Sequence, residues 1–311
     1  MNLRVTPAPH IRDEDSTRQI MRDVCIALLP ALLFGVYWFG FRVLAVTAAA
    51  VLGAVGAELL GNRLFFRERR LDWSAAVTGL LLAMTLPVTV SLWAAALGGL
   101  FAVFVMKALA GGLGQNVFNP ALAARALLVL FVPLQMTRYA GVDGVSAATP
   151  LHHMIIPALP EESITDLFLG FCPGSIGEVS SLAILLGGAY LVWRGVISLR
   201  IPAAYLGTVA VLTLVFHKTD AAIPWMLCQL FSGGLMLAAF FMATDYASSP
   251  VTPLGQIVHG IGCGALTVLF HCFGIFPEGV TYAILLMNAA AWAVDRYTAP
   301  IVFGHRTGGV A

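Results

Sequence analysis

Long apolar runs separated by short polar segments dominate the chain from about residue 24 onward. A helix that crosses a membrane needs roughly 17–25 predominantly apolar residues, and runs near this length recur throughout. The pattern therefore predicts an all-α integral membrane protein with about ten transmembrane helices. We expect these at residues 24–41, 43–60, 74–91, 92–109, 121–134, 179–193, 201–216, 224–243, 256–274 and 279–294.

Composition supports a lipid-facing surface. Apolar residues make up 59% of the 311 positions, and charged residues only 11%, against about 25% in ordinary soluble domains. So few charges do not cover a water-facing surface. The same numbers exclude disordered, collagen-like and disulfide-rich secreted classes, and a net charge of +1 gives no reason to expect nucleic acid as a partner.

Ten such helices leave no room for a large soluble domain. We expect a first half over residues 1–134 with five spans, an outer loop over 135–178, and a second half over 179–311 with five more. The acids of the outer loop, Glu178 among them, are expected to solvate it. No metal site is predicted, because the five cysteines show no CxxC or Cx4C spacing.

The distribution of Lys and Arg predicts the orientation, since cytoplasmic segments carry the excess. With the amino terminus in the cytoplasm, thirteen of the 17 fall in cytoplasmic segments and Arg125 falls in the short fifth run. Only Arg42, Arg138 and Lys218 then lie outside. An even number of spans returns the carboxyl terminus to the cytoplasm as well.

A weak internal repeat relates the two halves. GLLLAMT at 79–85 is echoed by GLMLA, followed by AFFMAT, at 234–244. The two segments run in opposite directions in this topology, so five spans per half would form an inverted repeat. The alternative is that spans rich in Leu and Ala resemble one another by chance.

The first interruption of the helical pattern is GGLGQNVFNPALAARAL at 111–127. Its glycines permit unusual backbone angles, and Asn119-Pro120 is typical of a helix start. The following apolar run is short for a full crossing. A re-entrant segment at 111–120, with Asn116 and Asn119 supplying polar contacts, and an ordinary interfacial turn are both consistent with this pattern.

The second interruption is ATDYASSPVTPLGQ at 243–256. Thr244, Asp245 and Ser248 stand there between two long apolar runs. They could bind the polar groups of a ligand or satisfy two helix ends. An acid near the end of a span is a candidate functional residue. Glu58 and Asp295, like Asp245, are interpreted as isolated acids near the membrane surface.

The third interruption is DGVSAATPLHHM at 143–154, in the outer loop. Small residues surround the hydroxyl of Thr149, and Pro150 biases Thr149 toward extended backbone. From the residues alone this is an accessible threonine or a plain Ser/Thr turn.

Together, the segments GGLGQNVFNPA (111–121), SAATPL (146–151) and FFMATDYASSP (240–250) resemble one family. It comprises the RnfD component of Rnf ion-translocating electron-transport complexes and the NqrB component of sodium-pumping NADH:quinone reductases. The likeness extends over nearly the whole chain. The RnfD type is favoured, because only about 23 residues precede the first apolar run.

The resemblance implies an inverted five-plus-five helix fold and a covalent flavin mononucleotide (FMN). In this family an S-x-A-T motif carries FMN as a phosphoester on its Thr, here Thr149. Ser146 is then expected near the phosphate, with Ala148 and Pro150 as neighbours. Ala147 stands where relatives frequently have Gly, which affects the expected loop geometry. A second, non-covalent flavin stays open, with Asn116, Asn119, Thr244, Asp245 and Ser248 as candidate contacts.

The implied function is electron relay within an ion-translocating oxidoreductase of a bacterial or archaeal cell membrane. The chain would contribute to that enzyme without forming a complete active site, and no GxGxxG nucleotide motif follows a strand. Expected partners are iron–sulfur subunits, another FMN-bearing subunit, membrane lipid and a flavin transferase. The sequence leaves open whether sodium or protons move. An NqrB-like component of a quinone reductase, a flavin-free channel or transporter, and a purely structural component are the alternatives.

Overall fold

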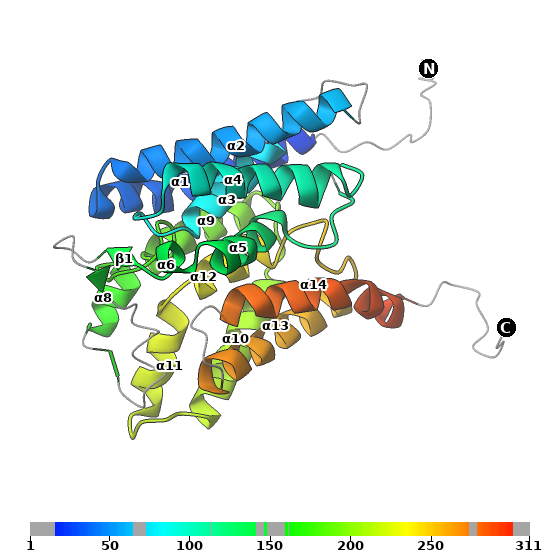
Figure 1. Ribbon diagram of the computed structural model, residues 1–311. Coiled ribbons are helices and arrows are strands. Elements are labelled where there is room, and N and C mark those ends of the chain that lie inside the picture. Colours follow the sequence, from blue (N-terminus) through cyan, green and yellow to red (C-terminus); the bar gives the residue numbers. More distant parts are fainter. Residues whose placement is uncertain are drawn as a thin grey trace, which may run out of the picture.

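The computed structural model describes residues 16–64, 73–112, 114–140, 146–147, 159–160, 162–273 and 279–300. Helices form nearly all of the regular structure in these ranges (Figure 1). The first-half helices are α1 (Thr17–Phe39), α2 (Arg42–Leu64), α3 (Ser74–Met84), α4 (Leu92–Val103) with the π-helix η1 (Phe104–Ala108), and α5 (Pro120–Phe131). The second-half helices are α9 (Ser181–Trp193), α10 (Arg200–Val215), α11 (Ala222–Phe231), α12 (Leu235–Leu237) with the π-helix η2 (Ala238–Met242), α13 (Pro253–Phe273) and α14 (Gly279–Thr298).

Short elements lie in the segment between the halves, which the sequence predicts to be on the outer side. They are α6 (Pro133–Met136), α8 (Ile164–Leu169), and the strands β1 (Tyr139–Ala140) and β2 (Ser146–Ala147). The strands pair antiparallel, with Tyr139 opposite Ala147.

Each of the ten predicted apolar runs coincides with a helix or a broken helix. Among the described residues, α1, α2 and α13 are long and apolar enough to cross a membrane. A fourth candidate is α11 with α12–η2, which bends by 63° at its break. Several other helices are apolar but only 10–17 residues long. This set fits a multi-pass membrane protein, and the count of ten crossings stays a prediction.

The two halves use the same helix pairing. In the first half α2 packs most extensively on α4, and in the second half α10 packs most extensively on α13. Glycines permit both approaches: a side chain at Gly53 would meet the backbone of Ala96, and one at Gly264 would meet the carbonyl of Tyr205. If five helices in each half correspond in order, these are equivalent pairs, which supports the predicted repeat.

The start of α5 is built as the sequence predicts. Asn119 is the N-cap, because its side-chain oxygen accepts hydrogen bonds from the backbone N–H groups of Ala121 and Leu122. Pro120 occupies the first helical turn, where no intrahelical N–H is needed. Upstream, Gly111 and Gly112 adopt φ of +115° and +108°, which residues with a side chain rarely adopt.

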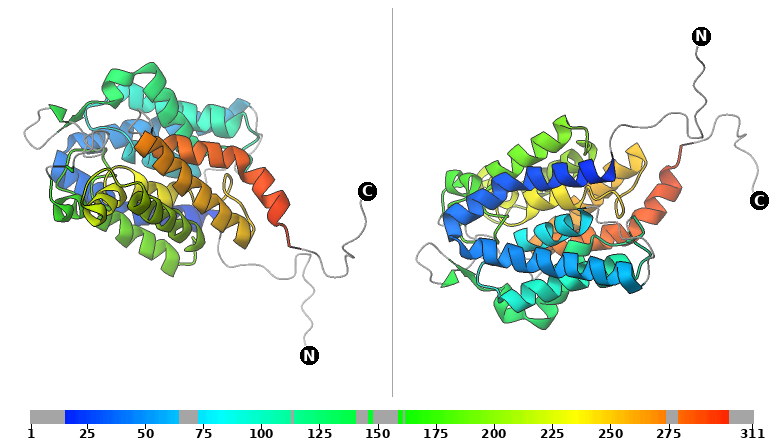
Figure 2. Two further views of the ribbon diagram at one scale, coloured as in Figure 1. Left: turned by 90° about the horizontal axis from the view of Figure 1, so that it is seen from below. Right: turned by 90° about the horizontal axis from the view of Figure 1, so that it is seen from above.

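The described ends of the chain lie at one end of the helical body and the β1–β2 hairpin at the other (Figure 1). Figure 2 shows α1 between α2 of the first half and α9 of the second, and α1 contacts both helices. The core between the halves is apolar, with Leu82, Met84 and Leu235 fully buried. The halves therefore form one packed unit with two distinct ends.

Candidate functional site

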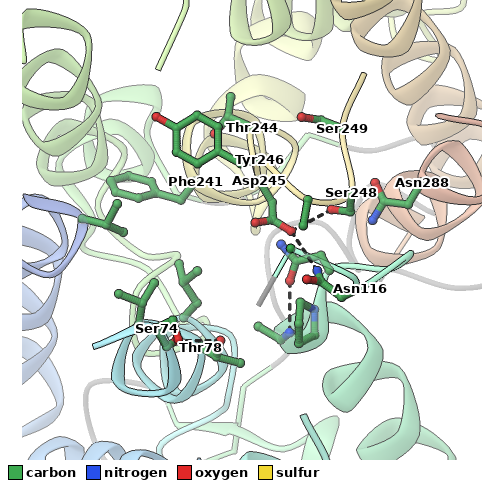
Figure 3. A pocket seen from close by; sticks show the side chains of 18 of the residues that line it. Ser74, Thr78, Asn116, Phe241, Thr244, Asp245, Tyr246, Ser248, Ser249 and Asn288 are labelled. Carbon is green, nitrogen blue, oxygen red and sulfur yellow. Dashed lines mark hydrogen bonds between the residues drawn. The ribbon is translucent and has the colours of Figure 1, made fainter. Parts of the chain in front are cut away.

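The first two interruptions of the helical pattern meet in space. The side-chain amide of Asn116 donates to Asp245 Oδ2 at 3.3 Å, and the amide of Asn119 donates to the Met242 carbonyl at 3.2 Å. Ser248 Oγ donates to the same carboxylate oxygen of Asp245 at 2.8 Å. Figure 3 shows the Asn116 and Ser248 side chains converging on Asp245. Candidate residues from opposite halves therefore form one polar cluster.

This cluster forms one wall of a cavity of about 630 Å³. Thr17, at the start of α1, and Asp295, near the end of α14, also line it, so the cavity lies at the end of the body where both described chain ends are found. Its other walls come from α1, α3, α9, η2 and α14. They include Met21, Val24, Val77, Thr78, Leu81, Leu191, Phe240, Phe241, Asn288 and Trp292.

Asp245 and Thr244 follow directly on η2. The Thr244 hydroxyl donates to the carbonyl of Phe240 at 2.7 Å, so it satisfies a backbone carbonyl of the π-helix η2. π-Helical turns are frequent at functional sites. Burial raises the pKa of the Asp245 carboxyl, and the hydrogen bonds from Ser248 and Asn116 oppose that shift because they stabilise the carboxylate.

Sequence reasoning missed Asn288. In the orientation that satisfies its amide, Asn288 donates to the carbonyls of Ile284 and Ser248 and accepts from the backbone N–H of Asn119. It is 2% exposed and so joins α14 to both interruptions. A signal was present, since Asn288 is a lone amide within an otherwise apolar run.

Glu58 is not isolated, contrary to the prediction. It is buried, and its carboxylate lies 2.7 Å from Lys107 Nζ of η1. Lys107 also donates to Ser74 Oγ at the start of α3. Lys107 and Ser74 line the cavity, so they place a paired charge on the wall facing Asp245. A buried acid needs such a partner, because desolvation is otherwise too costly.

Glu178 does not solvate the outer loop, which corrects a second expectation. It is 6% exposed and forms an ion pair with Arg125 of α5. Arg125 lies on the buried face of α5 with Leu122 and Leu128, and an acid of the connecting segment compensates its charge. Both side chains line a small second cavity that also includes Thr281.

Of the candidate residues in the third interruption, the described part of the chain includes Ser146, which does not line this cavity. Ser146 belongs to β2, at the opposite end of the body from the described chain ends (Figure 1). Ala148, Thr149 and Pro150 lie outside the described residues. The predicted site residues therefore fall into two groups: five around the cavity and four in the outer segment.

A family model described as "NQR2, RnfD, RnfE family" matches residues 4–304. The chain belongs to this family. The match covers both interruptions at the cavity and the SAATPL segment, so it confirms the resemblance inferred from those motifs.

Family relatives are similar over almost their full length. The chain is 45% identical to the D subunit of the Na⁺-translocating ferredoxin:NAD⁺ oxidoreductase complex of Acetobacterium woodii, over 98% of this chain and 96% of that protein. It is 39% identical to the D subunit of the proton-translocating ferredoxin:NAD⁺ oxidoreductase complex of Clostridium ljungdahlii, over 97% and 96%. It is 38% identical to the D subunit of the ion-translocating oxidoreductase complex of Stutzerimonas stutzeri, over 94% of each.

Proposed function

We propose that this chain is the membrane-embedded, RnfD-type electron-transfer component of an Rnf-type ion-translocating oxidoreductase, with FMN esterified to Thr149 on the outer side. The observation that carries the proposal is similarity over nearly the full length to the D subunits of such complexes, together with an intact SAATPL segment at 146–151. The complex would supply the iron–sulfur subunits, the nucleotide site and a second FMN-bearing subunit.

The positions of the elements support an outer flavin. The β1–β2 hairpin, whose second strand ends two residues before Thr149, lies at the end of the body away from the described chain ends. The excess of Lys and Arg in the predicted cytoplasmic segments favours a cytoplasmic location for those chain ends. Electrons from a cytoplasmic donor would therefore have to cross the membrane to reach Thr149 and return, which gives the complex a means of coupling electron flow to ion movement.

The cavity is suited to a second, non-covalent flavin. Its volume of about 630 Å³ falls in the range of small-molecule sites, roughly 300–1,000 Å³. Apolar walls from Phe241 and Trp292 would accept a planar ring. The side-chain oxygen of Asn116 would accept a hydrogen bond from the polar edge of the ring, because both N–H groups of this amide donate to Phe118 and Asp245; the chemistry of the ring is one- and two-electron transfer. The fit rests on this acceptor and on the apolar walls, with Asp245 holding the Asn116 amide in place.

The covalent flavin is tested on a denaturing gel. The wild-type chain, produced with its flavin transferase, should fluoresce as a flavoprotein, and its intact mass should exceed that of the polypeptide by FMN less one water. Thr149→Ala should lose both signals, whereas Ser146→Ala, which keeps the hydroxyl at 149, should retain the added mass. Fluorescence that survives in Thr149→Ala would refute the attachment site.

The non-covalent flavin is tested on the same protein. Acid extraction of purified Thr149→Ala should release a flavin if the cavity holds one. Asn116→Leu should reduce the amount released without changing the covalent mass of a chain that retains Thr149. A flavin-free extract from a folded protein would limit the chain to the covalent cofactor.

A further inference from the structure

A row of buried polar side chains runs along α13. His259, Cys263, Thr267 and His271 recur every fourth residue and therefore lie on one face of the helix. The first three are 0% exposed, and His271 is 7% exposed. At about 1.5 Å per residue the row extends roughly 18 Å, more than half of a hydrocarbon core of about 30 Å. We call these four residues the α13 polar row.

His259, the first residue of the row, is buried without a hydrogen-bond partner among the described residues. Among the described residues, no group bonds either ring nitrogen, although the side chain is fully buried. An unpaired buried imidazole is costly. A water molecule or a proton in transit would give the ring nitrogens of His259 a temporary partner, which would account for the buried imidazole.

Two further members have polar neighbours on adjacent helices. Tyr205 of α10 and Thr267 share a hydrogen bond of 2.7 Å between their hydroxyl oxygens. His271 Nδ1 lies 3.1 Å from the amide oxygen of Gln229 on α11. His271 Nε2 has no partner among the described residues. Each member of the row except Cys263 therefore offers a nitrogen or oxygen atom that a proton could use.

The charged residues on the helices around α13 indicate which end of the α13 polar row lies next to the cavity. α13 packs against α10 and α14. On α14, the Asp295 carboxylate accepts hydrogen bonds from the backbone N–H groups of Val251 and Thr252, directly before α13 begins, at 3.0 and 3.2 Å, and Asp295 lines the cavity. The other titratable or charged residues on these two helices, besides Tyr205, are Tyr282, Arg296 and Tyr297 on α14 and Arg200 at the start of α10. Asp295 is thus the acid that connects the row to the open end of the body.

We propose that the α13 polar row, with Tyr205, is a proton pathway that leads from the cavity at Asp295 toward the outer end of α13. This extends the proposed role in redox-driven ion translocation, because it names protons as an ion that this chain itself can move. Intramembrane His residues that face the protein interior are typical of proton relays, whereas a sodium site would require several oxygen ligands.

Transfer along the row needs no oxidant or reductant. A proton arriving at one ring nitrogen of His259 allows a proton to leave from the other. The Tyr205–Thr267 hydroxyl pair accepts a proton at one oxygen and releases one at the other. Between His259 and Thr267, about 12 Å apart along the helix, a chain of water molecules beside Cys263 would carry the proton. His271 repeats the imidazole exchange toward Gln229. Only N–H and O–H bonds form and break, and each complete transfer moves one H⁺, with its positive charge, down the membrane potential.

The pathway is tested with the full chain in liposomes that contain a pH-sensitive dye. A potassium diffusion potential set with valinomycin should drive protons faster through wild-type proteoliposomes than through protein-free ones. His259→Gln and His271→Gln should each slow this flux by about tenfold or more, since positioned proton-transfer groups contribute on the order of 10²–10⁴ in rate. Tyr205→Phe, which keeps the ring in the core, should slow it as well.

Two matched controls exclude general damage. His217→Gln removes an exposed imidazole beyond the end of α10. Thr213→Val removes a buried α10 hydroxyl that donates to the carbonyls of Val209 and Ala210 on its own helix. Both should keep the wild-type flux. Wild-type liposomes no faster than protein-free ones, or row variants that are folded and as fast as wild type, would overturn the pathway.

The same assay separates this proposal from the flavin proposal. Thr149→Ala should lose the covalent flavin and keep the proton flux, because no step along the row involves the outer segment. Loss of flux in Thr149→Ala would contradict the independence of the row. Failure of flavin attachment with normal flux would count against the proposed cofactor alone.

Discussion

Asn116 and Asp245 are 129 residues apart in the chain, yet the amide of one donates to the carboxylate of the other at 3.3 Å. Asn116 lies in the loop before α5, and Asp245 lies in the loop after η2. Asn288 binds both loops from α14. The two halves are therefore joined by side chains of two loops and one helix at the wall of the cavity, where neither half alone provides a complete set of donors and acceptors.

The raised pKa of Asp245 predicts a pH-dependent stability. The folded chain holds this proton more tightly than the unfolded chain, so ionisation costs stability above the ordinary Asp pKa of about 3.9. The cost is absent below that pH and grows until the pH passes the raised pKa. Asp245→Asn should therefore match wild type near pH 4 and melt at increasingly higher temperature than wild type toward pH 7.

Thermal unfolding in detergent across that pH range measures the effect. Ser248→Ala should melt at an increasingly lower temperature than wild type toward pH 7. This variant lacks a hydrogen bond that stabilises the charged form of Asp245. Asp220→Asn, at an exposed acid, serves as the control and should show no pH-dependent difference. A constant offset between Asp245→Asn and wild type at every pH would contradict the burial argument.

The buried Glu178–Arg125 ion pair predicts a large loss of stability when one partner is removed. Glu178→Gln should destabilise the protein by about 3–5 kcal/mol, because Arg125 would keep a buried charge without its carboxylate. The double variant Arg125→Met with Glu178→Met should recover part of that loss, because neither charge remains. Chemical unfolding in detergent checks both, and equal stability of the single and double variants would show that the pair is not coupled.

The sequence predicted helices and motifs better than it predicted partners. Ten apolar runs, the Asn119 cap and the glycines at 111 and 112 follow from local periodicity and backbone rules. The partners of Glu58 and Glu178 do not follow from such rules. Lys107 and Arg125 lie 49 and 53 residues away, and nothing in the local sequence distinguishes them from the other basic residues. The π-helices η1 and η2 also leave no local signal, since they depend on packing against distant helices: η1 contacts α2 and α5, and η2 contacts α9, α10 and α14.

Close packing of α2 on α4 predicts opposite outcomes at two glycines of the same helix. A Cβ at Gly53 would clash with the carbonyl of Ala96, whereas a Cβ at Gly56 would meet nothing within 4 Å. Gly53→Ala should therefore destabilise by about 1–3 kcal/mol. Gly56→Ala should be neutral or stabilising by up to about 1 kcal/mol, through helix propensity. Comparable melting temperatures for the two variants would mean that the helices can separate without cost.

The common position of both described chain ends predicts the orientation of the whole molecule. Thr17 and Asp295 line one cavity, so α1 starts and α14 ends at the same end of the body, and the excess of Lys and Arg predicts that this end faces the cytoplasm. Helix α10 carries a matched pair for testing this, since Arg200 begins it and His217 follows its other end. Both residues are exposed.

In a cysteine-free background, His217→Cys should react with a membrane-impermeant maleimide in intact cells. Arg200→Cys should react only after the membrane is permeabilised. A fluorescent protein fused after Ala311 should fluoresce, as expected for a cytoplasmic carboxyl terminus. The reverse labelling pattern would place the segment that contains Thr149 in the cytoplasm. Because the proposed electron path requires the flavin on the outer side, that single result would remove the coupling between electron transfer and the membrane.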